Sequence, residues 1–535
     1  MLRTSRYRMF PVGLALAAAG CQDLTVVNPN LPDAARATTQ PLTTESFAAS
    51  SFRSWWPVAG HGGYPGIAFA VMSRDVTSGF ADFGQLELST EPRTSWNNSE
   101  VNARRQVNQD PWYGYYRTIS AANDVVAGVN GGLVIVNPVR TARAKAMGKF
   151  MQGLSYGYLG LMYDKAVVTD ERTKLDTIVT PTFSSYPAVI TAAIAQLDSA
   201  AAVAGSQPTM TFPVENFLFQ ALTRDQFVRL TNSYAARLLA YSPRTRAERA
   251  AVNWAEVLRR IDAGVQVDFA PVAQLDILVD DWKRLLARLR TAGRPSDYAR
   301  PSYWLIGPAD STNGWQNWLA TANDNRLPFQ LRTRDRRIQG AAGPTAPGTY
   351  MGYNLNNLFA VSRGSWRFSH YYFLRYGTGI SWQTGPQAEL TVTEMDLLKA
   401  EALIRLNRAA EAVPLINKTR VANGQLPPVT LDGPPIAPGC VPRKLNGSCG
   451  SLWDALRHEK GIELLGMNGM VSFFDGRGWQ TIPANTPAQF PIPGRELSTL
   501  RQPFYSFGGI GGQSSMLDPD AERCPLTNIP LSRCP

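Results

Sequence analysis

Residues 395–420, MDLLKAEALIRLNRAAEAVPLINKTR, carry the pattern that decides the fold class. Apolar residues recur every three or four positions from Met395 to Leu406, break at Asn407 and resume towards Ile416. This spacing is typical of a buried helix face, and Asn tolerates the left-handed conformation that ends many helices. Pro414 falls inside the second run, where it marks a first turn or a kink. The stretch therefore predicts two helices joined by a tight turn.

The same kind of hairpin is predicted elsewhere in the chain. Helical spacing is found over residues 147–161, over 227–241 followed by 254–261, and from Ser451, which with Asp454 resembles a capping box, to Leu465. The first of these helices contains four glycines: Gly148, Gly153, Gly157 and Gly160. Each costs about 1 kcal/mol relative to Ala, so we expect a neighbouring helix to approach closely there. Together these patterns predict a mainly α fold of tetratricopeptide-like helical hairpins, although no clean 34-residue repeat is present.

Two long stretches, 46–115 and 266–390, interrupt the hairpins and are dense in Trp, Tyr, Gly and Pro. Such length without helical period is usually functional or contains strands, so we expect a loop-rich, partly β ligand-binding face. Flat aromatic rings stack on sugar rings, and neighbouring amides bind hydroxyl groups. The candidate ligand-binding residues are Trp96, Asn97, Tyr303, Trp304, Trp315 and Trp318. The alternative is that these tryptophans fill the core beneath long loops, as we expect for residues 112–116.

The N-terminus predicts export and lipidation. Residues 1–20 combine a basic start with a short apolar run, as in a signal peptide, and the run is too short to span a membrane. The sequence Ala18-Ala19-Gly20-Cys21 resembles a bacterial lipobox, in which the cysteine receives acyl chains such as palmitate. We expect a lipoprotein signal peptide over 1–20 and a lipidated tether over 21–45. The alternative is an ordinary signal peptide that is cleaved nearby.

Four cysteines follow the lipobox: Cys440, Cys449, Cys524 and Cys534. An even number in an exported protein predicts disulfides, and four cysteines allow three pairings. Nearest-neighbour pairing would close two short loops. The spacing does not fit a zinc site, so we expect no metal.

Charge and motifs exclude several function classes. The net charge of +11 is dispersed, and the densest basic run, residues 332–337, belongs to no nucleic-acid-binding module. Residues 153–157 match the G-x-S-x-G nucleophile elbow, but Ser155 falls within a predicted helix rather than at a strand–helix turn. The chain has three histidines and no Walker, Rossmann or H-E-x-x-H motif. We therefore expect no enzyme activity, no catalytic residues and no cofactor, although the two carboxylates of a glycosidase would leave no mark in the sequence.

Four motifs resemble the SusD/RagB family of lipoproteins. They are Trp112-Tyr113-Gly114-Tyr115-Tyr116 through Ala122-Asn123-Asp124-Val125; Lys399 to Arg408 with Ile416 to Arg420; His458-Glu459-Lys460 with Glu463-Leu464 and Phe474-Asp475-Gly476-Arg477-Gly478; and Phe490-Pro491-Ile492-Pro493 with Glu496. Lys460 stands where the family usually has Arg, and Asn468 stands in a usually acidic turn. The motifs keep the family's order and are structural rather than catalytic.

The resemblance implies a single SusD-like α–α superhelical domain over residues 46–535, with a helical part at about 46–265 and a second part at about 266–535. It also implies an outer-membrane lipoprotein, anchored by Cys21 and facing the cell exterior, that binds oligosaccharides and delivers them to a SusC-like TonB-dependent β-barrel transporter. RagB-like members capture peptides instead, and exposed arginines such as Arg332 and Arg334 would then matter more. A lipid-anchored glycoside hydrolase is the alternative from another class.

Overall fold

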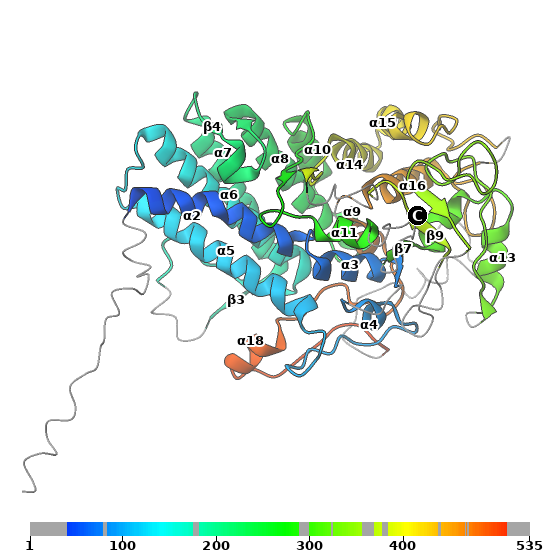
Figure 1. Cartoon of the computed structure of the whole chain (residues 1–535), viewed down its shortest axis with the longest axis horizontal. Helices are drawn as coiled ribbons and strands as arrows, with labels where there is room; N and C mark the ends of the chain where they lie inside the picture. Colours follow the sequence, from blue (N-terminus) through cyan, green and yellow to red (C-terminus); the bar gives the residue numbers. More distant parts are fainter. Residues whose placement is uncertain are drawn as a thin grey trace, which may run out of the picture.

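The computed structural model describes residues 40–78, 83–174, 181–287, 299–322, 325–355, 369–376, 384–436, 440–465, 467 and 470–510. Helices dominate this part of the chain (Figure 1). The first half contains α2 (Pro41–Trp55), α3 (Gly63–Met72), α4 (Gln85–Ser89), α5 (Gln106–Asn130), α6 (Pro138–Met162), α7 (Tyr186–Gly205), α8 (Arg224–Tyr241), α9 (Arg246–Ala250) and α10 (Trp254–Asp262). The second half contains α11 (Asp281–Ala287), α12 (Tyr303–Ile306), α13 (Gly314–Ala320), α14 (Val392–Arg405), α15 (Ala409–Ala422), α16 (Leu452–Leu464), α17 (Val471–Trp479) and α18 (Gly494–Thr499). Short 3-10 or π turns are η1 (Trp56–Ala59), η3 (Val214–Leu218) and η5 (Gly307–Ala309).

Helix α6 is the centre of the first hairpin stack, because α5, α7 and α8 all pack against it. A Cβ atom added at Gly148 would lie 2.7 Å from Val126 of α5, and one at Gly153 would lie 2.7 Å from Leu197 of α7. At Gly157 the Cβ would lie 2.6 Å from Leu238 of α8. The predicted role of these glycines in close helix approach is confirmed, and it explains why α6 tolerates their lower helix propensity.

The predicted hairpins are present. Helices α14 and α15 pack against each other, and Asn407 between them has the expected left-handed conformation, with φ of 60°. Pro414 lies inside α15. Helix α10 packs on α8 after the short α9, and α16 begins with the predicted capping box, in which the Asp454 amide donates to the Ser451 hydroxyl at 3.2 Å. The mainly α fold of tetratricopeptide-like hairpins is therefore confirmed.

The strands are short and pair in twos, all antiparallel, within the described residues. The pairs are β1 (Val76–Ser78) with β7 (Ala299–Pro301), β2 (Lys165–Val167) with β3 (Phe183–Ser185), β4 (Thr211–Phe212) with β5 (Leu222–Thr223), β6 (Val272–Ala273) with β10 (Gly385–Pro386), and β8 (Met351–Tyr353) with β9 (Tyr371–Phe373). Figure 1 shows β7, β9 and α13 among loops on the right of the view, away from the stack of α2, α5, α6 and α7. The strands fasten these loops rather than forming a sheet-centred core.

The two halves of the chain share one core. Helix α3 packs on α17, where the Phe69 and Phe473 ring centroids lie 4.8 Å apart, and α10 packs on α14. The C-terminal segment returns to the first half, because the Phe490 amide donates to the Met162 carbonyl at 2.8 Å. Residues from about 46–265 and about 266–510 therefore fold against each other.

Helix α7 alone among the described residues is long and apolar enough to cross a membrane by length and composition. It packs between α6 and α8 in the helical stack. Its Asp198 also accepts a hydrogen bond from Arg260 of α10 at 2.9 Å. These contacts make α7 part of the scaffold.

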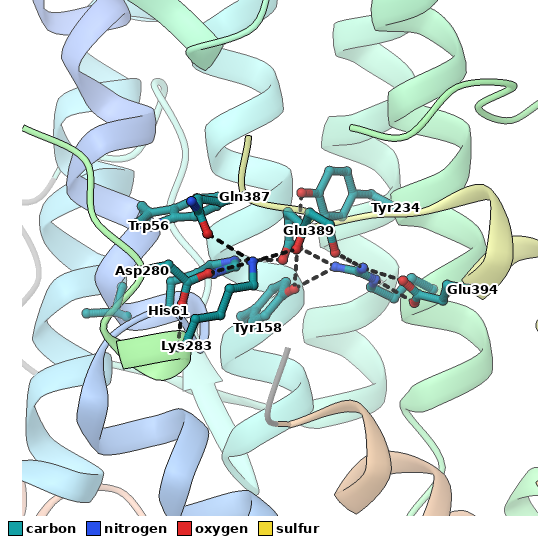
Figure 2. Close-up of polar contacts among 12 residues, drawn as sticks. Trp56, His61, Tyr158, Tyr234, Asp280, Lys283, Gln387, Glu389 and Glu394 are labelled. Carbon is teal, nitrogen blue, oxygen red and sulfur yellow. Dashed lines mark hydrogen bonds and ion pairs between the residues drawn. The ribbon is translucent and has the colours of Figure 1, made fainter. Parts of the chain in front are cut away.

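A buried ion network joins loops to the helical stack (Figure 2). The His61 ring donates to Asp280 at 2.9 Å through Nδ1 and to Glu389 at 2.7 Å through Nε2. Glu389 also pairs with Arg237 of α8. Burial opposes a charge on the imidazole, but the two carboxylates outweigh it, so the pKa of His61 is raised. Both ring nitrogens act as donors, and the ring stacks on Trp56 with centroids 3.5 Å apart.

Candidate functional site

Four of the six predicted ligand-binding residues come together on the short helices α12 and α13. Tyr303 lies 5.1 Å from Trp318 between ring centroids, and Trp304 lies 6.4 Å from both Trp315 and Trp318. Ser302 caps α12, because its hydroxyl accepts from the Trp304 amide at 3.2 Å. The cap fixes the start of the helix that carries two of the rings.

Most of these rings are closed to solvent. The exposed fractions are 0% for Tyr303, 2% for Trp315 and 5% for Trp318, whereas Trp304 is half-buried. A Cβ atom at Gly307 would lie 2.2 Å from the Trp315 ring, so the backbone of η5 lies against that indole. These three residues lie in the core beneath the loops, which is the alternative that the sequence leaves open for the tryptophans. A ligand contact stays a prediction for Trp304.

Two arginines lie over the rings of this group. The guanidinium of Arg74 is 4.5 Å from the Trp304 ring centroid, and that of Arg326 is 4.6 Å from the Trp318 ring centroid. Glu91 holds Arg74 by two hydrogen bonds of 2.8 Å. Burial lowers the pKa of Arg326, and the positive charge of Arg74 lowers it further. The Trp304 cluster is the set Arg74, Tyr303, Trp304, Trp315, Trp318 and Arg326.

Trp96 and Asn97 lie elsewhere in the molecule. Trp96 is 4% exposed, and its ring packs 5.4 Å from that of Phe490, so it belongs to the core. Asn97 is exposed and accepts a hydrogen bond from the Ser99 amide at 3.0 Å, which makes it a turn residue. The pocket beside them has a volume of about 10 Å³, enough for about one water molecule. The structure therefore does not join these residues to the Trp304 cluster, and only Asn97 is open to a ligand.

A disulfide between Cys440 and Cys449 closes a short loop that contacts α13. Within the loop that it closes, the Lys444 carbonyl accepts from the Gln316 side chain at 3.1 Å, and the Arg443 amide donates to Pro308. This bond agrees with nearest-neighbour pairing. Cys21, Cys524 and Cys534 lie outside the described residues.

The residue types of the cluster are ones that can stack on a ligand and donate hydrogen bonds to it. A half-buried indole offers a flat apolar face and edge, and guanidinium groups supply fixed hydrogen-bond donors for hydroxyl or carboxylate oxygens. No group of three or more His, Cys, Asp or Glu side chains is placed to hold a metal ion within the part of the chain that the structure describes. Ser155 lies in the middle of α6 and is fully buried, so residues 153–157 do not form a nucleophile elbow.

The protein is similar to known proteins in its three-dimensional structure rather than in its sequence. No protein-family model and no curated protein matches the chain. A SusD superfamily protein from Bacteroides thetaiotaomicron matches with a TM-score of 0.56 and 15% identity, and one from Bacteroides vulgatus with 0.54 and 13%. Each match covers 86% of this chain and 97% of the other. Surface glycan-binding protein A from Bacteroides thetaiotaomicron, solved with laminarihexaose, matches with a TM-score of 0.52 and 11% identity over 86% of this chain and 98% of that one.

The chain has the SusD fold. The similarity inferred from four short motifs is therefore confirmed at the level of the fold. The matches cover nearly the whole of each solved chain and 86% of this one, so the shared arrangement extends over most of the chain.

Several motif residues hold this SusD fold together through buried ion pairs. Arg249 binds Glu401 at 2.7 Å and Asp475 at 2.8 Å, and Lys460 binds Asp475 at 2.7 Å. Around Arg337, partners come from one loop and one helix: Asp335 at 2.7 Å, Glu459 at 2.6 Å and Glu463 at 2.8 Å. These charges are almost completely buried. The prediction that the motifs are structural is consistent with this placement.

Sequence reasoning missed Arg74 and Arg326 of the Trp304 cluster. Arg74 follows α3, and Arg326 lies in a loop after α13. Neither belongs to a recognisable motif, and Arg74 reaches Trp304 only because β1 pairs with β7 immediately before α12. Because β1 and β7 are far apart in the sequence, no local sequence pattern predicts this contact.

Proposed function

We propose that the protein is a surface-exposed outer-membrane lipoprotein that binds oligosaccharides and delivers them to a TonB-dependent transporter. The observation that carries the proposal is the SusD fold, shared over 86% of the chain with a surface glycan-binding protein solved with laminarihexaose. The lipobox at Cys21 supports the anchor, and the resemblance to SusD/RagB lipoproteins supports the transporter partner.

In this proposal the Trp304 cluster is the ligand contact. Trp304 presents the partly open indole, and Arg74 lies beside it, held in place by Glu91. The buried rings of Trp315 and Trp318 pack against the edge or face of Trp304 and support it. A preformed aromatic support with a few directional donors suits neutral sugars, whose C–H faces and hydroxyl groups match those two features. The chain would release its ligand unchanged.

Calorimetric titration with a panel of neutral oligosaccharides that includes laminarihexaose tests the binding step. We expect at least one to bind, and Trp304→Ala to weaken that binding at least tenfold. Trp453→Ala is the matched control, because Trp453 is also half-buried and Arg405 lies 5.1 Å over its ring. Equal losses in both variants, or no loss in Trp304→Ala, would contradict the placement of the site.

Peptide capture is the second candidate, since Arg332 and Arg334 are exposed as that alternative requires. Titration with an acidic peptide library separates the two ligands.

Chromatography of the oligosaccharides after long incubation tests hydrolysis, for which we expect no products. The mass of the first peptide of the native protein tests the acyl chains on Cys21, and co-purification from outer membranes tests the β-barrel partner.

A further inference from the structure

A basic cleft lies on the helical stack. It has a volume of about 370 Å³ and opens between one face of α2, the start of α6 and residues 213–219. The lining residues that matter here are Glu45, Arg53, Arg140, Arg143, Phe217 and Ile277. We name this site the Arg53 cleft. In Figure 1, α2 and α6 lie to the left of the view, whereas α13 of the Trp304 cluster lies at the right.

The charges in the cleft do not balance. Three guanidinium groups face one carboxylate among the lining residues. Glu45 accepts from Arg140 Nε at 2.9 Å and from Arg143 Nη2 at 2.9 Å. Burial opposes the charge on Glu45, but hydrogen bonds from both arginines outweigh it, so its pKa is lowered and it stays an anion. The lining therefore keeps an excess of two positive charges.

Donors remain for a second anion. Arg143 Nε is buried and has no hydrogen-bond partner among the described residues. Arg53 is exposed, and its Nη2 donates a long hydrogen bond of 3.5 Å to the Asp276 carbonyl. Guanidinium groups bind carboxylate and phosphate oxygens through such paired donors. The cleft thus offers more donors than Glu45 uses.

The position of two of these arginines is locally unfavourable. Arg140 and Arg143 occupy the first two turns of α6, a 25-residue helix with no acidic residue in its first turn. Cations near the N-terminus oppose the helix dipole, whereas anions there are stabilised. A helix selected for stability alone would carry Asp or Glu at this end. An anion bound in the cleft would offset both the dipole and the repulsion among the arginines.

We propose that the Arg53 cleft binds the carboxylate or phosphate group of a small acidic ligand. Its volume falls within the range of small-molecule sites, about 300–1,000 Å³. Arg53 takes the oxyanion, the charge of Arg143 attracts it although Nη1 and Nη2 of that side chain bind Thr211 and Glu45, and Phe217, Phe219 and Ile277 pack against the carbon skeleton. This site is separate from the Trp304 cluster and does not depend on the proposed function.

Titration calorimetry with galacturonate, inorganic phosphate and galactose tests the proposal, with galactose as the uncharged match. We expect one or both anions to bind at low salt and galactose not to bind in the cleft. Raising the salt from about 0.05 to 0.5 M should weaken anion binding at least tenfold, because it shortens the screening length. Binding of galacturonate alone identifies a carboxylate ligand. Phosphate binding, repeated with phosphatidylglycerol vesicles, distinguishes a soluble phosphate from a lipid headgroup.

Three variants should change anion binding in different directions. Glu45→Gln frees the donors of Arg140 and Arg143, so we expect at least fivefold tighter anion binding. The double variant Arg53→Gln, Arg143→Gln should weaken binding at least tenfold, while Arg117→Gln on the exposed face of α5 leaves it unchanged. Unchanged melting temperatures show that each variant is folded. No anion binding, or binding that ignores Glu45 and Arg53, would overturn the proposal, whereas the Trp304 titrations decide the proposed function separately.

Discussion

The His61 network and the Trp304 cluster place a cation over an indole ring in two very different surroundings. His61 stacks on Trp56 in full burial, and both of its nitrogens donate to carboxylates. Arg74 lies over Trp304 at a half-buried position, where the indole N–H has no partner among the described residues. A cation over an indole therefore belongs to a fully paired, buried network in one region and lies at a partly open ring in the other. The two regions differ in the cation, His61 or Arg74, and in burial, and it is burial that decides whether a ligand could reach the ring.

The largest effect is expected from Glu389→Gln. This change removes the carboxylate shared by His61 and Arg237 and leaves buried cations without their partner, so the free energy of unfolding should fall by about 3–5 kcal/mol. Urea denaturation measures it. Glu91→Gln, which removes the partner of the partly buried Arg74, is the comparison and should lose less, about 1–3 kcal/mol, because water still reaches both side chains. Equal losses of unfolding free energy in the two variants would show that the His61 network is no more important for stability than the pair of Arg74 and Glu91.

Truncation of the tryptophans should separate stability from binding. Trp318→Ala removes a ring that is 5% exposed, so we expect a loss of about 3–5 kcal/mol in unfolding free energy. Trp304→Ala should lose less, about 1–2 kcal/mol, because the ring is already partly solvated. Its main effect should be on oligosaccharide affinity. Denaturation curves and titrations on both variants check this, and a larger stability loss in Trp304→Ala would contradict the division.

Close helix packing gives a smaller effect. Gly157→Ala forces a methyl group to within 2.6 Å of Leu238, so we expect a loss of about 1–3 kcal/mol in the free energy of unfolding. Gly205→Ala at the end of α7 is the control, since nothing lies within 4 Å of its Cβ position. That control should be neutral or stabilising by about 0.5 kcal/mol. A neutral Gly157→Ala would mean that α6 and α8 are further apart than described.

The pH dependence of the His61 network should be the subtlest effect. Because the folded pKa of His61 is raised above its usual 6.5, its stabilising charge is fully present below pH 6.5 and is lost as the pH rises through the folded pKa. The stability difference between wild type and His61→Gln should therefore shrink as the pH rises above 6.5. Burial opposes ionisation of Glu389, but Arg237 and His61 lower its pKa to about 2, so its contribution is lost as the pH falls from 4.5 towards 2. If the difference between wild type and His61→Gln stays constant as the pH rises above 6.5, the imidazole of His61 is not charged in the folded protein.

Part of the helical stack could be predicted from the sequence because its signals are local, whereas α2 and α3 lie mostly within residues 46–115, where loops and strands were expected, and α7 was not predicted. Apolar spacing located α6, α8, α14 and α15, and the glycines of α6 pointed to close neighbours. The Ser451–Asp454 capping box located the start of α16. These features depend on residues within one or two turns of each other.

The site could be predicted only in part. Aromatic density drew attention to α12 and α13, but composition does not tell which ring faces solvent, and Tyr303, Trp315 and Trp318 proved to be core. Arg74 reaches Trp304, and Glu389 reaches His61, through the tertiary fold alone. Contacts between residues so distant in sequence depend on how loops cross the helical stack.

A crystal structure of the protein with its tightest-binding neutral oligosaccharide tests the central claim most directly. We expect a sugar unit against the open side of Trp304, with a hydroxyl group within hydrogen-bond distance of Arg74. A sugar bound elsewhere with Trp304 untouched would contradict the account, as would a chain that binds no oligosaccharide under any condition in which it is folded.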